Sequence, residues 1–284
     1  MGATIETAGV IGAGFMGSGI AESVARAGVP VVLFEPEGAP LKRSKAGIDK
    51  SVARAVERGK LSEEDAEALR ERITWTKDFD ALGGADLVME AIVEDAAVKG
   101  ETFQRLDALV GENTILATNT SSIPIAQIAS WTANPSRVVG LHYFSPVPVM
   151  KLVEVVVGLE TDEKVVDAAC DFARSIDKHP ILTKDRSGFI VNMLLIPYLM
   201  AAVTMYSDGF ASREDIDAGM VMGCGHPMGP LTLCDFIGLD VMFAIGQSLY
   251  DEFKRPEYAP PPLLKRMVMA GHHGRKSGRG FYEY

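Results

Sequence analysis

The 284-residue chain carries 38 acidic and 28 basic residues, so its formal net charge is −10. This balance argues against general binding to nucleic acids or anionic membranes, because both favour a basic surface. Hydrophobic residues make up 47% of the chain, enough for a sizeable core in one large or two ordinary domains. The three cysteines are widely spaced and form no CxxC pair, which predicts free thiols in a reducing, cytoplasmic setting rather than disulfides or a zinc site.

Up to about residue 185, short β-branched runs alternate with helical stretches. This alternation predicts an α/β domain built on a doubly wound, mostly parallel sheet with helices on both faces. The strands are expected at 9–12, 31–35, 86–92, 114–119, 137–144, 152–157 and 180–183. An insertion at 37–72 is predicted to form two antiparallel helices, with Gly59 at the turn and Ser62 and Asp65 in the capping box of the second helix.

Three glycines, Gly12, Gly14 and Gly17, follow the first strand in GxGxxG order and open a helix. In a Rossmann-type sheet this turn lets backbone N–H groups and the helix N-terminus meet a pyrophosphate. Glu35 ends the next strand, where a carboxylate accepts ribose hydroxyls and repels a 2′-phosphate. The pattern therefore predicts NAD rather than NADP. The alternative is that the glycines serve only a tight turn between strand and helix.

A row of basic residues lies in the first helix of the insertion. Lys50, Arg54 and Arg58 recur every four residues and share one helix face. Such a row is often only a solvated face. The other interpretation is a binding site for a phosphate-rich ligand, which an acidic protein would otherwise repel.

Small polar residues fill the segment "ATNTSSIP" after the strand at 114–119. They are interpreted either as the N-cap of the following helix or as donors facing a ligand cleft. Both roles are compatible when different residues fill them. The residues are Asn119, Thr120, Ser121 and Ser122.

His142 and Glu154 stand twelve residues apart in otherwise apolar strand segments. A buried carboxylate is costly without a partner, and the two prolines between them predict a bend that sets the strands side by side. Oxidation of a secondary alcohol by a nicotinamide requires a base, and a carboxylate would hold the imidazole and stabilise its charged form. The alternatives are a core histidine and an exposed acid on an edge strand.

After "KDRSG" the strands end and helices are expected at 189–208, 212–222, 230–253 and 261–270. We therefore predict an α/β domain at 1–186 and a separate all-helical domain at 187–284. The charge-free run 187–207 is interpreted as a buried or interface helix rather than a membrane span. Within it, Asn192 needs a partner, either another helix or a ligand. His226, His272 and His273 lack metal-site spacing, so no metal is predicted.

Taken together, these segments resemble the L-3-hydroxyacyl-CoA dehydrogenase family over nearly the full length of the chain. The sequence segments that carry the resemblance are "VIGAGFMGSGIA", "EAIVED" with Lys99, "TNTSSI", "GLHYFSPVPVMKLVEV", "DRSGFIVN", "GHPMGPLTLCDFIGLD" and "GRKSGRGFYEY". This ordered set is more specific than any single motif.

The resemblance implies NAD-dependent interconversion of a short 3-hydroxyacyl-CoA and its 3-ketoacyl-CoA, in a protein that dimerises through its helical domain. By position, His142 matches the catalytic base, Glu154 its orienting partner, Ser121 the residue that hydrogen-bonds the reacting oxygen and Asn192 an amide that holds the acyl part. The helix bearing Lys50 and Arg54 matches the region that meets coenzyme A. The implied cofactor positions are Gly12, Gly14, Phe15, Met16, Gly17, Glu35, Ala91, Glu94, Lys99, Asn119, Ser121 and Ser145.

Two departures from the family pattern affect the site. Many relatives have Asn at the position of Ser145 and Arg at that of Met193. Serine donates a hydrogen bond over a shorter reach, so altered affinity is expected before lost chemistry. The competing functions are a relative acting on 3-hydroxyadipyl-CoA or a free hydroxy acid, and a non-catalytic crystallin-like protein.

Overall fold

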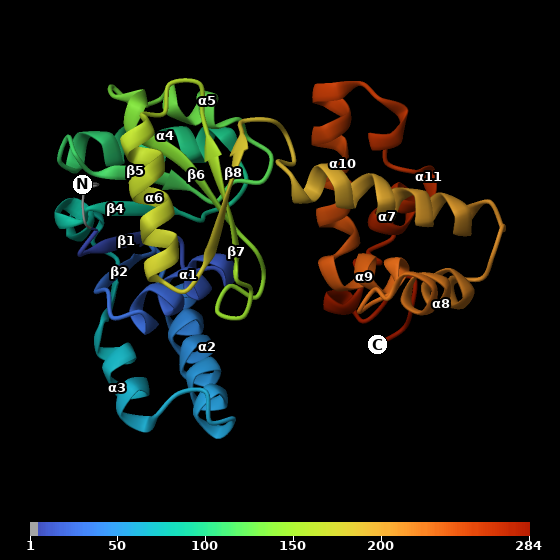
Figure 1. The fold of residues 1–284 in the computed structure, drawn as a ribbon, viewed down its shortest axis with the longest axis horizontal. Coiled ribbons are helices and arrows are strands. Elements are labelled where there is room, and N and C mark those ends of the chain that lie inside the picture. Colours follow the sequence, from blue (N-terminus) through green and yellow to red (C-terminus); the bar gives the residue numbers. More distant parts are fainter. Residues whose placement is uncertain (1–4) are drawn as a thin grey trace. The chain divides into compact units, whose positions relative to one another are not determined.

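The computed structural model describes residues 5–284 and divides the chain into two compact units, one ending at Asp185 and the other comprising Arg186–Tyr284. The division falls one residue before the boundary expected from the sequence. Each unit has its own buried hydrophobic core. Figure 1 shows the strands confined to the first unit and the second unit built from helices.

The first unit is built on an eight-stranded sheet in the order β3-β2-β1-β4-β5-β6-β7-β8. Only the β6–β7 pair is antiparallel; the other neighbours are parallel. This confirms the predicted mostly parallel, Rossmann-type sheet, and the order reverses between β1 and β4, where such folds bind ligands. The strands are β1 Ala8–Ile11, β2 Val31–Phe34, β3 Ile73–Thr76, β4 Leu87–Glu90, β5 Ile115–Thr118, β6 Val138–Tyr143, β7 Leu152–Val157 and β8 His179–Lys184.

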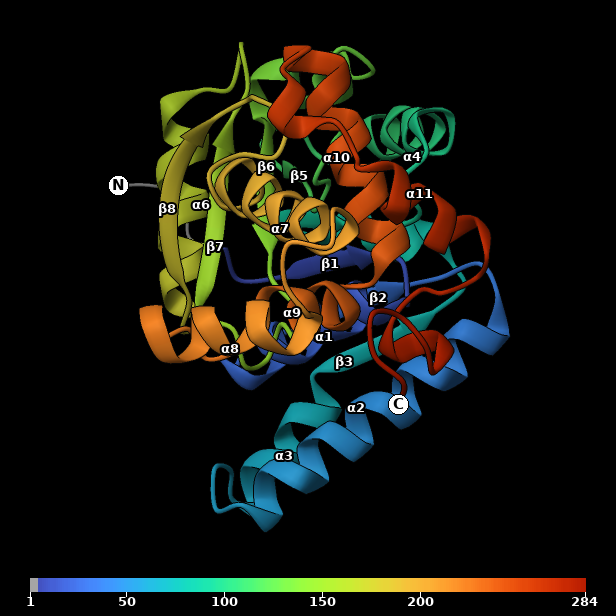
Figure 2. The ribbon, with the colours of Figure 1, turned by 90° about the vertical axis from the view of Figure 1, so that its right-hand side faces the viewer.

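Helices cover both faces of this sheet. Side chains of α1 and α6 share one buried core with strand residues such as Val10 and Leu33. On the opposite face, Ile125 of α5 and Leu82 of η1 approach the glycines of β6 and β1. Figure 2 shows α6 and α4 on opposite sides of the strands. The helices are α1 Phe15–Arg26, η1 Phe79–Gly84, α4 Ala96–Leu109, α5 Ile125–Ala129, η2 Pro135–Arg137 and α6 Glu163–Ser175.

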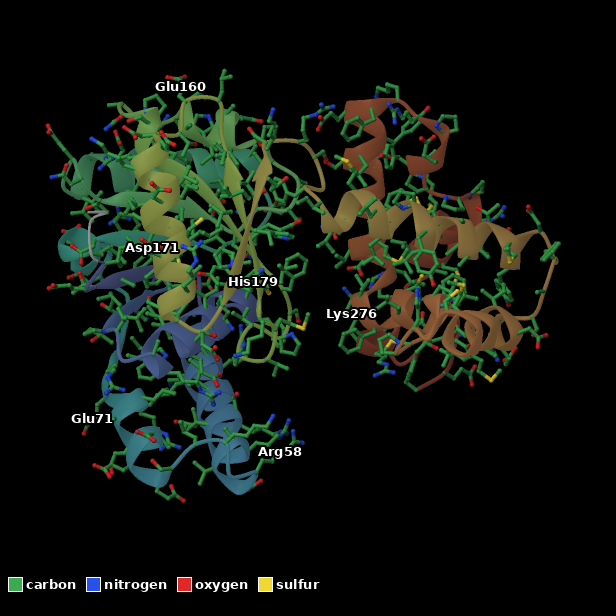
Figure 3. All side chains as sticks on the ribbon, viewed as in Figure 1. Arg58, Glu71, Glu160, Asp171, His179 and Lys276 are labelled. Atoms are coloured by element: carbon green, nitrogen blue, oxygen red, sulfur yellow. The ribbon has the colours of Figure 1, made fainter. Side chains whose placement is uncertain are left out.

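The insertion forms the predicted helical hairpin, α2 Gly38–Glu57 and α3 Glu63–Glu71. Gly59 has φ +65° at the turn, and the Ser62 hydroxyl accepts from the Asp65 N–H at 3.0 Å, so the predicted cap is confirmed. Figure 3 shows Arg58 at the end of α2 that lies away from the sheet. β3 follows this hairpin and was not predicted. Its four residues, "ITWT", are a strand by type, but they are too short to stand out from the helical pattern before them.

The second unit contains α7 Val191–Ser207, α8 Arg213–Cys224, α9 Pro230–Ile237, α10 Leu239–Phe253, η3 Pro256–Tyr258, α11 Pro262–Met269 and η4 Arg275–Ser277. The single helix predicted at 230–253 is wrong. Gly238 has φ +104°, and α9 and α10 meet there at 96°. Within residues 5–284 no single helix is long and apolar enough to cross a membrane, although the bent pair α9–α10 passes that test when its two helices are combined.

Candidate active site

The glycine turn joins β1 to α1 at the point where the strand order reverses. Gly12 has φ +104°, and a Cβ there would lie 2.6 Å from the Ala91 carbonyl oxygen. A Cβ on Gly17 would lie 1.9 Å from the Gly12 carbonyl oxygen. A Cβ on Gly14 would meet no atom within 4 Å, and no side chain caps the helix N-terminus behind it. The turn therefore leaves an open approach to backbone N–H groups, as a pyrophosphate requires.

A cavity of about 1280 Å³ opens over this turn. Glu35 lies in its wall at the end of β2, where its Oε2 accepts from the Ala13 N–H at 3.1 Å. The carboxylate is thus fixed beside the glycine turn, at the spacing that suits an adenosine ribose. The glycine cradle, the helix N-terminus and this acid together fit NAD. Other predicted cofactor positions in the wall are Phe15, Met16, Ala91, Glu94, Asn119 and Ser121.

A chain of ionic contacts begins behind the wall at Glu90, the last residue of β4. Glu90 is 0% exposed, and its Oε1 accepts from Lys99 Nζ at 2.6 Å and from the Ile92 N–H at 2.7 Å. Its Oε2 accepts from the Thr118 hydroxyl at 2.7 Å. Lys99, 1% exposed, also lies 3.2 Å from Glu94 Oε2. Lys99 is not a wall residue; its ammonium is held by two carboxylates.

Glu94 holds the polar turn that follows β5. Its Oε1 accepts from the N–H groups of Ser121 and Ser122, both at 3.2 Å, and from the hydroxyls of Thr120 and Ser122. Burial alone would raise the pKa of Glu94, but the Lys99 charge and these hydrogen bonds outweigh it and hold the pKa below 4.5. An ionised Glu94 therefore fixes the backbone of Ser121.

His142 and Glu154 lie directly opposite each other on the antiparallel pair β6–β7. His142 Nδ1 is 2.7 Å from Glu154 Oε2, and His142 is 7% exposed and Glu154 0% exposed. The bend expected from the prolines is present, and the predicted contact is confirmed. The alternative that Glu154 is an exposed acid on an edge strand is wrong, because β7 pairs with β8 on the side away from β6. Asn119 ties this pair to the turn after β5, since its Oδ1 accepts from the Tyr143 N–H at 2.8 Å.

Several predicted site residues lie elsewhere. Lys50 and Arg54 are exposed on α2 and are not in the cavity wall. Ser145 is exposed beside the wall residue Pro146. Asn192 is half-buried in the first turn of α7, in the second unit, and its contact with a ligand stays a prediction. Within residues 5–284 no cluster of three or more His, Cys, Asp or Glu side chains is arranged to hold a metal ion.

The wall residues that were not predicted from the sequence include Glu22, Arg43, Ser51 and Arg105. Arg43 lies seven residues before Lys50, so the same helical spacing was available to find it. The guanidinium carbon of Arg105 lies 3.9 Å from the ring centre of Phe79. This contact joins distant segments, so no local sequence pattern predicts it. Glu22 is buried, accepts from the Ser51 hydroxyl at 2.8 Å, and its pKa is raised by burial. Its signal was the single carboxylate among the small apolar residues of α1.

The arrangement supplies the parts needed for hydride transfer coupled to proton transfer. A cradle suited to NAD opens beside Ser121, and Asn119 links the turn that carries Ser121 to the strand that carries His142. With the carboxylate on Nδ1, the imidazole is held in one tautomer and one orientation.

Comparison with known proteins gives the same assignment. Residues 7–186 match the family "3-hydroxyacyl-CoA dehydrogenase, NAD binding domain", and residues 188–284 match "3-hydroxyacyl-CoA dehydrogenase, C-terminal domain". The chain is 50% identical to a 3-hydroxybutyryl-CoA dehydrogenase of Mycobacterium tuberculosis over 100% of both chains. It is 43% identical to the mitochondrial hydroxyacyl-coenzyme A dehydrogenase of Homo sapiens, covering 97% of this chain and 90% of that one.

Among solved structures, the (S)-3-hydroxybutyryl-CoA dehydrogenase PaaH1 of Ralstonia eutropha superposes with a TM-score of 0.95 at 42% identity, over 99% of each chain. Both family profiles together account for nearly the whole sequence, and the first contains the cavity and the His142–Glu154 pair. The chain therefore belongs to the 3-hydroxyacyl-CoA dehydrogenase family.

Proposed function

We propose that this chain is an NAD-dependent 3-hydroxybutyryl-CoA dehydrogenase, which interconverts (S)-3-hydroxybutyryl-CoA and acetoacetyl-CoA. The observation that carries the proposal is the buried contact between His142 and Glu154 within an NAD-binding domain. The substrate comes from the relatives that match over their full length, which are named 3-hydroxybutyryl-CoA dehydrogenases.

NAD, when bound, supplies the hydride acceptor or donor at its nicotinamide. Because Glu154 occupies Nδ1 of His142, Nε2 is the nitrogen that exchanges a proton with the substrate. In the oxidative direction His142 takes the proton of the C3 hydroxyl, and in the reductive direction it returns that proton to the carbonyl oxygen. Glu154 stabilises the imidazolium formed during oxidation. The Ser121 hydroxyl hydrogen-bonds the reacting oxygen, and Asn192 holds the acyl part.

The remaining assignments concern the cofactor, coenzyme A and assembly. Glu35 would receive the adenosine ribose, Glu94 would lie on the nicotinamide side, and Ser145 would anchor the nicotinamide or the substrate. Lys50 and Arg54, both exposed cations on α2, receive phosphates of coenzyme A.

Exposed apolar side chains of the second unit, Leu194 and Met222 among them, support self-association of that unit into a homodimer. Three free thiols support a reducing cytoplasmic setting.

The test measures the reduction of acetoacetyl-CoA by NADH as the loss of NADH absorbance. The same assay is run with 3-ketoadipyl-CoA and with free acetoacetate as alternative substrates. We expect the highest kcat/KM with acetoacetyl-CoA, and a fall in kcat of about 10²- to 10⁴-fold for His142→Ala with NADH binding retained. Preference for the free acid, or full turnover by His142→Ala, would refute the proposal. Loss of Lys50 and Arg54 should raise KM for the CoA ester and leave that for acetoacetate unchanged.

A further inference from the structure

Glu90 is a fully buried carboxylate that the mechanism above does not use. It is absent from the cavity wall, so it contacts neither the cofactor nor the substrate there. A carboxylate in a dry interior costs several kcal/mol unless it is paired and hydrogen-bonded. Glu90 has three donors, the Lys99 ammonium, the Thr118 hydroxyl and the Ile92 N–H, at 2.6 to 2.7 Å. This complete set of donors makes its side chain a fixed point.

Two routes of contacts lead outward from Glu90. The shorter runs from Oε2 through the Thr118 hydroxyl to the Thr120 N–H, at 3.2 Å, and the longer runs through Lys99. Lys99 Nζ lies between Glu90 Oε1 at 2.6 Å and Glu94 Oε2 at 3.2 Å, so a single buried cation joins the two acids. Glu94 in turn receives the N–H groups of Ser121 and Ser122 on its other oxygen. On the Lys99 route, Glu94 and Ser121 line the cavity whereas Glu90 and Lys99 do not, so this route begins in the core and ends at the wall.

The charges determine what happens when Glu90 is lost. Lys99 is 1% exposed and now has two anionic partners. Without the charge of Glu90, Glu94 is the sole ionic partner of Lys99. The attraction of Lys99 to Glu94 is then no longer balanced by its attraction to Glu90. Glu94 Oε2 is then drawn toward the ammonium, which moves Oε1 away from the turn that it holds. A shift of this kind displaces Ser121 without removing any group from the cavity.

We propose that Glu90 is a positioning residue that acts through Lys99 and Glu94 to fix the turn carrying Ser121. The inference rests on the proposed function only in the role of Ser121 toward the reacting oxygen. The contribution is geometric, since a displacement of about 1 Å at a reacting group can cost roughly 100-fold in rate. A purely structural role for Glu90 would change stability alone.

The test variant is Glu90→Gln, which keeps the shape and one acceptor oxygen but removes the charge. The matched control is Asp107→Asn, which breaks a second, largely buried ion pair of α4, the helix that carries Lys99, with Arg137 at 2.6 Å. We expect hydrogen exchange of the Ser121 and Ser122 amides to accelerate at least about 10-fold in Glu90→Gln and to stay unchanged in Asp107→Asn. Unchanged exchange in a folded Glu90→Gln protein would overturn the inference, whatever the activity.

A double-mutant cycle tests the route to Ser121. Glu90→Gln should lower kcat by about 10- to 100-fold, with NADH binding by fluorescence within about twofold. In the Ser121→Ala background the same change should lower kcat by less than about threefold, because the group that it positions is gone. An equal loss in both backgrounds would overturn the inference. Inactivity of the wild-type chain would instead count against the proposed function and leave the exchange test to decide on Glu90.

A variant without a charge change covers the case in which Glu90→Gln does not fold. Thr118→Val removes the hydroxyl that holds Glu90 Oε2 and keeps all three charges of the Lys99 route. It also removes the acceptor of the Thr120 N–H in the turn, at 3.2 Å. It should accelerate exchange of the same two amides and lower kcat to a smaller degree. Native exchange and native kcat in Thr118→Val would overturn the inference.

Discussion

At the scale of single residues, the site is a set of buried carboxylates with different partners. Glu154 pairs with an imidazole at 2.7 Å, Glu90 with an ammonium at 2.6 Å and Glu22 with a hydroxyl at 2.8 Å. Only the first two partners carry or can acquire a positive charge. For Glu22, burial raises the pKa by more than the Ser51 hydroxyl and the Arg26 and Lys178 charges lower it.

Glu154→Gln should lower kcat by about 100-fold or more, because the amide keeps the contact with Nδ1 but no longer stabilises the imidazolium. NADH binding should stay near the native value. Steady-state kinetics with acetoacetyl-CoA and NADH titration by fluorescence measure the two quantities. Glu160→Gln, the same change at an exposed glutamate (Figure 3), is the control. Native kcat in Glu154→Gln would contradict the role given to the pair.

Glu22→Gln should raise the free energy of unfolding at pH 7. Burial raises the pKa of Glu22 above its ordinary 4.5, so the unfolded chain releases this proton at lower pH than the folded chain. The folded state thus loses stability as pH rises from 4.5 through the folded pKa. Gln removes that charge and keeps an acceptor for Ser51. Urea unfolding at several pH values should show a gain at pH 7 that disappears below 4.5, and a loss at pH 7 would contradict this account.

At the scale of elements, local sequence patterns predicted most strands of the sheet. They failed where contacts between distant segments determine the structure. Alternating β-branched runs located seven strands, and Ser62 located the start of α3. The break at Gly238 was missed because α9 and α10 are both apolar and helical in pattern, and the turn depends on a positive φ. The His142–Glu154 pair was predictable from one bend, whereas the link from Glu90 to Ser121 runs through the side chains of Lys99 and Glu94 to a backbone N–H of another segment.

The helix α5 begins just after the Ser121 turn and is capped from far along the chain. Asp185 accepts from the N–H groups of Ile125 and Ala126, both at 2.8 Å. Asp185→Ala should lower the free energy of unfolding by about 1–2 kcal/mol, as for other lost caps. It should also lower kcat, because the cap holds the segment that follows Ser121.

Asp162→Ala is the matched control, since Asp162 caps α6 by accepting from the Lys164 N–H at 2.9 Å. No residue of α6 lies in the cavity wall. Urea unfolding should show a similar loss of stability for both variants, and kinetics should show lower kcat only for Asp185→Ala. Equal kcat values in the two variants would mean that the cap at Asp185 supports the fold and does not position the site.

At the scale of the whole molecule, the two units are stabilised by different means. The first unit buries a sheet between helices, and its carboxylates cluster near the cavity. The second unit uses two buried acids to close its fold around the end of the chain. Asp217 accepts from the Leu231 and Thr232 N–H groups and from the Tyr282 hydroxyl, and Asp235 accepts from the Phe281 and Tyr282 N–H groups. Phe281 is therefore part of the core of this unit.

Asp235→Ala should destabilise the second unit by about 2–6 kcal/mol, because two backbone N–H groups lose their acceptor and Phe281, 3% exposed, loses the anchor of its segment. A Cβ on Gly280 would lie 1.9 Å from Asp235 Oδ1, so Gly280→Ala should disturb the same contact with the acid intact. Hydrogen exchange should accelerate in α7 and α9 for both variants and stay native in β1 and β4. Asp208→Ala, an exposed acid at the end of α7, should change neither. Native protection of α9 in Asp235→Ala would show that the second unit closes without this carboxylate.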